Sequence, residues 1–208
     1  MEDVLDLYAE PADPARPLVC FDEQPVVLRA DAHPGAPCTP GHPARIDYEY
    51  VREGTCCCLL ALAPHEGWRH VAVTAQRANA DFAHVMRWLA EEHYPAAAVI
   101  RVVLDNLSTH TPAALYQTFD AETARRLTQR LEFHYTPKHA SWLNMAEVEF
   151  AVLTRQCLGR RLPTRERVVR EVAAWEVGRN AARATVTWGF TTPTARARLA
   201  RHYPPQPT

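Results

Sequence analysis

Three acidic residues, Asp22, Asp105 and Glu147, stand where they could bind a metal ion together. Asp22 follows the apolar stretch PLVCF, Asp105 ends the run VIRVVLD, and Glu147 lies within SWLNMAEVEF. Hard divalent cations such as Mg²⁺ prefer carboxylate oxygens and require no Cys or His ligand. Two such ions a few ångströms apart can activate an attacking oxygen and stabilise a leaving oxygen on a phosphodiester. The residue types therefore suit a two-metal site for phosphodiester chemistry.

The hydrophobic pattern predicts the elements that would position these acids. Strands are expected within 17–28, ending near Asp22, and at 55–64, 68–76, 99–106 and 131–137. Helices are expected at 81–94, 111–119, 121–131, 142–158 and 165–184. Three strands in a meander, followed by alternating helices and strands, predict an α/β fold with a mixed central β-sheet flanked by α-helices. If the first and fourth strands are parallel neighbours, their ends bring Asp22 and Asp105 to one mouth of the sheet.

Each acid also has a purely structural interpretation. Asp105, in DNLST, can be an ordinary turn or helix cap, and Asp22 with Glu23 can be a solvated strand end. On the helix that follows the fifth strand, Glu147 and Glu149 fall on opposite edges of the apolar stripe. Helix geometry does not choose between these two glutamates.

Composition limits the class of protein. With 208 residues, 47% of them hydrophobic and 23% charged, the chain is typical of a globular protein. It contains no run of eighteen apolar residues, and its acidic start lacks the pattern of a signal peptide, so we expect a cytoplasmic location. The adjacent Cys56, Cys57 and Cys58 would face opposite sides of a strand and cannot bind one zinc ion together.

The net charge of −1 conceals an asymmetry. Residues 151–208 carry a net charge of +8, whereas residues 1–150 carry −9. A basic C-terminal end beside an acidic body is typical of a polyanion-binding surface next to a metal site. A solvated basic helix would have the same composition, so charge alone does not decide.

Three stretches, VCFDE, VLDNLSTHTPAAL and HYTPKHASWLNMAEVEF, resemble in this order the three acidic motifs of DDE transposases of bacterial insertion sequences in the Tc/mariner superfamily. The resemblance implies an RNase H-like fold, cleavage of DNA at transposon ends, and strand transfer into a target. Asp22 matches the first metal-binding Asp, Asp105 the second and Glu147 the final acid, which favours Glu147 over Glu149. The resemblance also implies two Mg²⁺ ions as cofactors, with Mn²⁺ as an expected substitute.

Further residues near these motifs are expected to support the site. Asn106 and His110 recur in the family's second motif, and we expect them to support the metal ligands or contact phosphate. Lys138, His139 and Asn144 lie on the approach to the last acid, where contacts to the DNA backbone would be useful.

The resemblance implies a division of the chain. Residues 1–16 are expected to be a connector from a missing N-terminal DNA-binding region, residues 17–160 the RNase H-like catalytic domain, and residues 161–208 a basic helical extension. The implied partners are DNA, at transposon ends and target, and a second copy in a homodimeric active complex. The implied location is the nucleoid of a bacterium.

Two rival functions remain open on sequence alone. The chain could be a truncated, non-catalytic DNA-binding or oligomerisation remnant, whose binding would come from the basic residues Arg160, Arg161, Arg165, Arg167 and Arg170. Alternatively, two carboxylates could serve a metal-independent glycoside hydrolase, which a chelator would leave active.

Overall fold

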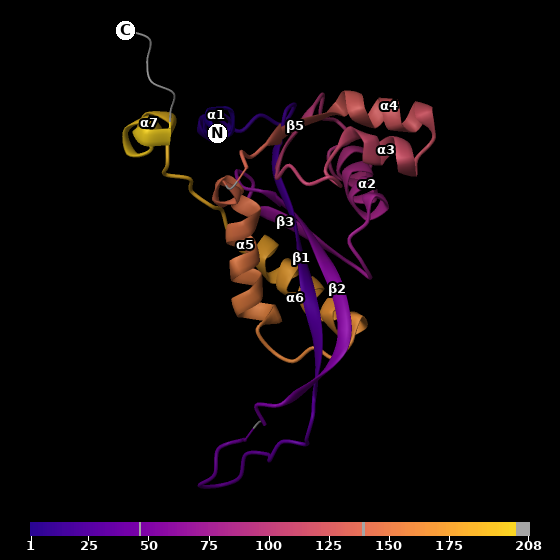
Figure 1. Cartoon of the computed structure of the whole chain (residues 1–208), viewed down its shortest axis with the longest axis vertical. Helices are drawn as coiled ribbons and strands as arrows, with labels where there is room; N and C mark the ends of the chain where they lie inside the picture. The colour runs from indigo at the N-terminus through magenta and orange to yellow at the C-terminus, as the bar shows by residue number, and fades with distance from the viewer. Residues whose placement is uncertain (46, 139, 203–208) are drawn as a thin grey trace.

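A mixed five-stranded sheet lies at the centre of the computed structural model, which describes residues 1–45, 47–138 and 140–202 (Figure 1). The strands are β1 Leu18–Asp31, β2 Tyr50–Ala63, β3 Trp68–Thr74, β4 Ile100–Leu104 and β5 Leu131–Tyr135. The α-helices are α1 Glu2–Ala9, α2 Asn79–Trp88, α3 Pro112–Thr118, α4 Ala121–Arg130, α5 Met145–Leu153, α6 Arg165–Ala181 and α7 Thr192–Arg198. Short π-helical segments, Leu89–His93 and Thr154–Leu158, extend α2 and α5, and 3₁₀ turns lie at Ser141–Leu143 and Ala200–His202.

The strand order is β3-β2-β1-β4-β5. The first three strands form the predicted antiparallel meander, and β1 pairs in parallel with β4, which pairs in parallel with β5. At the predicted turn between β2 and β3, Gly67 has a φ of +65°, a conformation that favours glycine. The predicted mixed sheet is therefore confirmed, and the first and fourth strands meet the condition for bringing Asp22 and Asp105 together, since they are parallel neighbours.

Side chains of each strand alternate between two layers of helices. On one face, Leu18 and Cys20 pack in a core with α1, α5, α6 and α7. On the other face, Val19 and Phe21 pack in a core with α2, α3 and α4. The three adjacent cysteines follow the same rule, since Cys56 and Cys58 lie in the first core and Cys57 in the second.

Strand β1 is longer than predicted. It continues past Asp22 to Asp31, paired with β2, so Asp22 lies within a strand and not at its end. The parallel pairing with β4 covers Leu18 to Cys20 only, so β1 has a single strand neighbour at Pro25, where proline is tolerated. Together β1 and β2 form a long hairpin that extends away from the helices (Figure 1).

The expected connector at residues 1–16 instead contains a helix of the core. In α1, the side chains of Val4, Leu5 and Tyr8 are buried against the sheet. The Tyr8 hydroxyl donates a hydrogen bond of 2.7 Å to the carbonyl of Leu143, just before α5. This packing could not be predicted from the sequence because Pro11 closely follows the helix and the partner lies more than a hundred residues away.

The expected extension at residues 161–208 also packs on the sheet, as far as the structure describes it. Val168 and Val172 of α6 are buried in the core that contains α5. Opposite β2, the free edge of β3 is covered by α6: Glu176 accepts the Val71 N–H at 2.9 Å, and the Asn180 amide pairs with the backbone of Arg69. The boundary expected at residue 160 therefore does not divide the core.

Helices long and apolar enough to span a membrane are absent from the described part of the chain.

Candidate metal-dependent active site

The register of β1 and β4 brings Asp22 and Asp105 together. Cys20 pairs with Val103, and the two aspartates each follow two residues later on their strands. Because strand side chains alternate, both carboxylates belong to the face that carries Cys20 and Val103, which is the face covered by α5. Parallel pairing thus places the first two predicted ligands side by side.

Helix α5 brings the third acid to the same place. Asn144 caps this helix: its side chain accepts the Ala146 N–H at 3.1 Å and donates to the carbonyl of Phe21 at 2.8 Å. The second bond ties the start of α5 to β1, one residue before Asp22. Glu147 lies in the first turn of the helix and lines an open hollow together with Asp22. Asn144 is buried, so its predicted supporting role fits this position and a DNA contact does not.

Glu149 points in another direction. Its carboxylate is 1% exposed and lies 2.9 Å from Nη2 of Arg179 and 3.1 Å from Nε of Arg69. The Glu149 carboxylate is therefore paired with two guanidinium groups in the core between α5, α6 and β3. Of the two glutamates that helix geometry left open, Glu147 is the one beside Asp22.

The three acids influence one another electrostatically. Burial, together with the negative charges of Asp105, Glu147 and Glu23, raises the pKa of Asp22 to about 7, against an ordinary value of 3.8. Because the folded chain holds this proton more tightly than the unfolded chain, Asp22 costs stability increasingly as the pH rises from about 4 to about 7. A bound cation would offset this cost.

His110 supports the site from the opposite side of the sheet. Nδ1 lies 2.6 Å from Oδ1 of Asp105, and Nε2 contacts Oε2 of Glu23. Burial opposes protonation of the ring, but these two carboxylates outweigh it and raise the pKa of His110 to about 9. The hydrogen bond from His110 in turn lowers the pKa of Asp105.

The remaining predicted residues occupy varied positions. Asn106 and Lys138 are exposed and line a second hollow with Asp105, where a phosphate could approach. His139 lies outside the described residues. Trp142, in the approach to Glu147, is 43% exposed and stacks on Trp188 with ring planes 15° apart.

Two further residues of the site, Glu23 and Arg155, were not predicted from the sequence. Glu23 follows Asp22, so strand alternation turns it to the α2 face, where it is nearly buried beside His110. Arg155 is exposed and lines the hollow with Asp22 and Glu147. Its position eight residues after Glu147, on one helical face, was a signal in the sequence.

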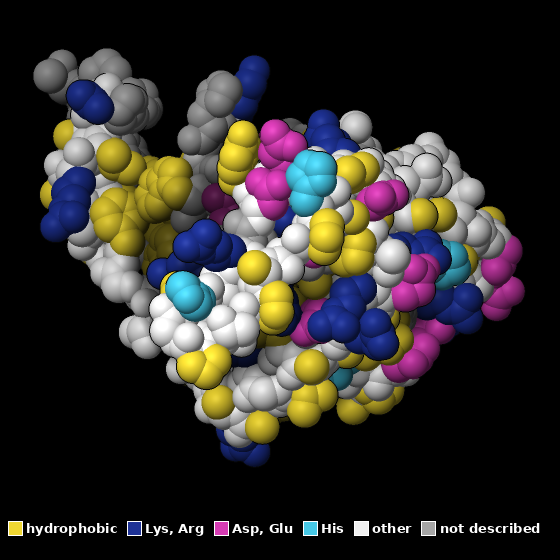
Figure 2. Space-filling view, turned by 90° about the horizontal axis from the view of Figure 1, so that it is seen from below, with side chains coloured by type: hydrophobic (Ala, Val, Ile, Leu, Met, Phe, Trp, Pro, Cys, Tyr) yellow, Lys and Arg dark blue, Asp and Glu magenta, His cyan; other side chains and the backbone are white. Residues whose placement is uncertain are grey.

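Four of the five arginines expected to bind DNA in a non-catalytic remnant form ion pairs within the protein. Arg160 and Arg167 both pair with Glu171, Arg161 pairs with Asp31, and Arg165 lies 3.8 Å from Glu166. Figure 2 shows the same mixture over one face of the molecule, where basic side chains are interspersed with acidic ones. The charge asymmetry of the sequence therefore does not become one continuous basic surface on this face.

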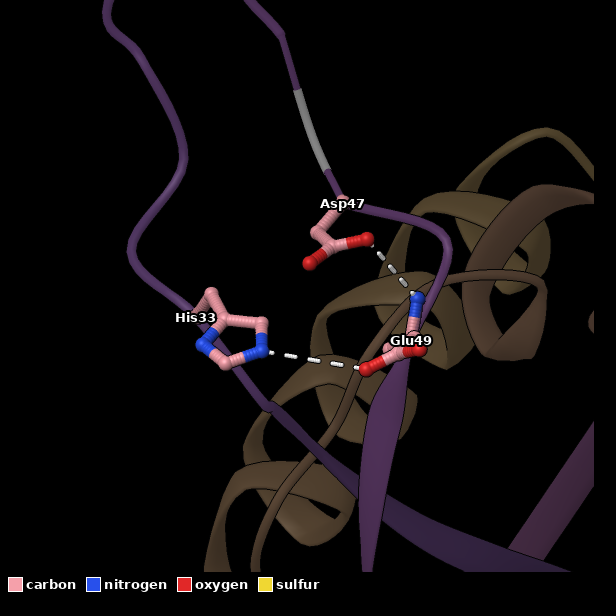
Figure 3. Close-up of side chains that lie close together, drawn as sticks. All are labelled: His33, Asp47 and Glu49. Atoms are coloured by element: carbon pink, nitrogen blue, oxygen red, sulfur yellow. Dashed lines mark hydrogen bonds and ion pairs between the residues drawn. The ribbon is translucent and has the colours of Figure 1, made fainter.

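The donor set at Asp22, Asp105 and Glu147 fits a hard divalent cation. All three ligands would be carboxylate oxygens, and the mutual repulsion of their charges is relieved when a cation binds. A second group, His33, Asp47 and Glu49, lies in the loop between β1 and β2 (Figure 3). The side chains of His33 and Glu49 are 66% and 54% exposed, so they are already solvated and gain less from an ion.

We expect Mn²⁺ or Mg²⁺ to raise the melting temperature of the wild-type chain at pH 8, where Asp22 is mostly ionised. Asp22→Asn removes a buried negative charge, so without metal this variant should melt a few degrees above the wild type. For a chain of this size, each kcal/mol of added stability raises the melting temperature by about 2–4 °C. The gain from metal should be largely lost in the variant. Differential scanning fluorimetry with and without EDTA measures both effects. An equal gain in the variant would show that Asp22 is not a ligand.

Two comparisons with known proteins find matches. The family model described as DDE superfamily endonuclease matches residues 17–169. The fold is similar to the Mos1 mariner paired-end complex with Mn, with a TM-score of 0.57 and 17% identity over 85% of this chain and 52% of that chain. It is also similar to the Mos1 transposase paired-end complex with left transposon end (TM-score 0.58, 16% identity, 85% and 52% covered) and to the Mos1 strand transfer complex (0.56, 16%, 85% and 51%).

The chain spans about half the length of these transposases. At such identities the likeness shows the fold alone, and it confirms the predicted RNase H-like fold. No curated protein sequence matches the chain.

Proposed function

Because the chain belongs to the DDE superfamily of endonucleases, we propose that it is the catalytic domain of a Tc/mariner-type insertion-sequence transposase. Its reaction would be cleavage of DNA strands at transposon ends, followed by transfer of the cut strands into a target. The observation that supports this best is the convergence of Asp22, Asp105 and Glu147 from two strands and a helix.

The three carboxylates would hold two Mg²⁺ ions, or Mn²⁺ in their place. When bound, such ions lower the pKa of the attacking hydroxyl and stabilise charge on the leaving oxygen. The chain itself supplies rigid positions, since Asp22 and Asp105 are placed by neighbouring strands and Glu147 by a capped helix. Water, and then a DNA 3′-hydroxyl, would attack phosphorus directly, so no covalent protein intermediate is needed.

Basic side chains in the two hollows beside the acids are suited to binding the phosphates of a DNA backbone. Arg155 lines the hollow with Glu147, and Lys138 lines the one with Asp105. A strand crossing the acids would have its phosphates within reach of both side chains. Phosphate contacts of this kind give affinity without sequence preference.

Arg155→Ala is expected to weaken binding of duplex DNA and to reduce the salt dependence of binding. The logarithm of the binding constant falls linearly with the logarithm of the salt concentration, and loss of one phosphate contact makes this slope shallower by about 0.9. Arg170→Ala, which changes an exposed arginine of α6 outside both hollows, is the matched control. Fluorescence anisotropy at several salt concentrations measures the slopes. Equal slopes for the two variants would place the DNA elsewhere.

The proposal extends to partners and location. The similar structures are described as paired-end and strand transfer complexes of Mos1 transposase. By analogy, we place transposon ends and target DNA at this site and a homodimer in the active complex. The corresponding location is the cytoplasm of a bacterium, where the protein would associate with the nucleoid.

Nicking of supercoiled plasmid by the purified chain tests the proposal. We expect nicked circles with Mn²⁺ or Mg²⁺ and none with EDTA. Folded wild-type protein that binds DNA in a salt-dependent way but never nicks it would favour the non-catalytic remnant. Activity that persists in EDTA would contradict a metal-dependent mechanism.

A further inference from the structure

We propose that Glu23 and His110 are positioning residues that fix the orientation of the Asp105 carboxylate for metal binding. The inference rests on the proposed function, because it concerns the same metal site. It adds a residue, Glu23, that lies on the opposite face of β1 from the ligands.

His110 joins two carboxylates inside the protein. The ring is fully buried, with Nδ1 2.6 Å from Oδ1 of Asp105 and Nε2 in contact with Oε2 of Glu23. Each ring nitrogen thus faces a carboxylate oxygen, Nδ1 that of Asp105 and Nε2 that of Glu23. One imidazole ring therefore connects the strand that carries Asp22 to the loop that carries Asp105.

The ring itself has little freedom. Phe21 and Phe82 flank it with ring centroids 5.3 and 5.1 Å away, and the Tyr135 hydroxyl donates to the backbone carbonyl of His110 at 2.8 Å. A fixed ring holds a fixed donor, Nδ1, against Oδ1 of Asp105. This matters because Asp105 follows the last residue of β4, where the chain leaves the sheet.

Glu23 is the second carboxylate that holds the buried His110 ring. Its side chain is 3% exposed, and a buried carboxylate is costly unless it is paired. His110 pairs with Oε2, and Nε of Arg77 lies 3.4 Å from Oε1. Glu23 thus anchors the His110 ring, and the ring holds Asp105, whose side chain is still 39% exposed.

Two substitutions separate positioning from packing. His110→Asn places an amide nitrogen near the position of Nδ1 and can still donate to Asp105. His110→Gln places it near the position of Nε2 and can donate to Glu23 but not to Asp105. Both remove the charge and keep a polar side chain of similar size, so they differ chiefly in which carboxylate they can reach.

Calorimetric titration of the full 208-residue chain with Mn²⁺, without DNA, is the test. We expect His110→Gln to weaken Mn²⁺ affinity about 10- to 100-fold, the usual effect of removing a partner that orients a ligand. His110→Asn should retain most of the affinity, and Glu23→Gln should fall between them. Circular dichroism establishes that each variant is folded. If His110→Gln alone does not fold, the double variant Glu23→Gln/His110→Gln, which removes both buried charges, should show the same weak binding.

Wild-type affinity in His110→Gln, or in the double variant, would overturn the inference. Equal weakening in His110→Asn and His110→Gln would overturn it as well, because the ring would then act through packing or charge alone. Absence of Mn²⁺ binding by the wild-type chain would contradict the proposed metal site itself. Failure of the inference and failure of the proposed function therefore give different results.

Discussion

Asp105→Asn is expected to reduce metal-dependent nicking of DNA by about 10³-fold or more, the scale of loss when a central group of an active site is removed. The amide has nearly the shape of the carboxylate and its oxygen can still accept the hydrogen bond from His110. It lacks the negative charge that binds a hard cation. Plasmid nicking over a range of Mn²⁺ concentrations measures the loss.

Two comparisons make this result specific. Glu147→Gln should lose activity to a similar extent, because it supplies the third carboxylate. Glu122→Gln, at an exposed position on α4, should nick DNA like the wild type. Full activity of a folded Asp105→Asn protein would contradict the assignment of the metal ligands.

Glu149→Gln is expected to destabilise the protein by about 3–5 kcal/mol, the usual cost of removing one partner from a buried ion pair. Glu149 and Arg69 are almost completely buried, and Arg179 forms three hydrogen bonds with the same carboxylate. A neutral amide leaves both guanidinium groups without their counter-charge. Urea unfolding followed by circular dichroism measures the change in the free energy of unfolding.

Glu147→Gln is the matched control for stability, since it changes the same residue type two positions earlier on the same helix. We expect its free energy of unfolding to stay within about 0.5 kcal/mol of the wild type, or to rise because a repulsive charge is removed. At a temperature where it remains folded, Glu149→Gln should still nick DNA. The opposite pattern, an inactive but stable Glu149 variant, would exchange the roles of the two glutamates.

Much of the framework could be predicted because it depends on local patterns. Apolar runs indicated the five strands, and their order with the helices indicated a mixed sheet. The strand alternation that separates Cys57 from its two neighbours also places Asp22 and Asp105 on one face. The choice of Glu147 required the family resemblance, because both edges of the α5 stripe carry a glutamate.

The remaining features depend on contacts between distant segments. Tyr8 and Leu143, or Arg69 and Glu149, meet through tertiary packing, which no local pattern specifies. The basic extension was overestimated as a binding surface for the same reason, since a charge count does not show that Arg161 pairs with Asp31. The bridge from Glu23 through His110 also joins segments far apart in the chain.

Anomalous diffraction from crystals of the wild-type chain soaked in Mn²⁺ tests the central claim most directly. We predict anomalous peaks between Asp22, Asp105 and Glu147, with carboxylate oxygens at about 2.1 Å, the distance typical of a small hard divalent cation. Peaks confined to the exposed group of His33, Asp47 and Glu49, with none beside Asp105, would contradict the claim.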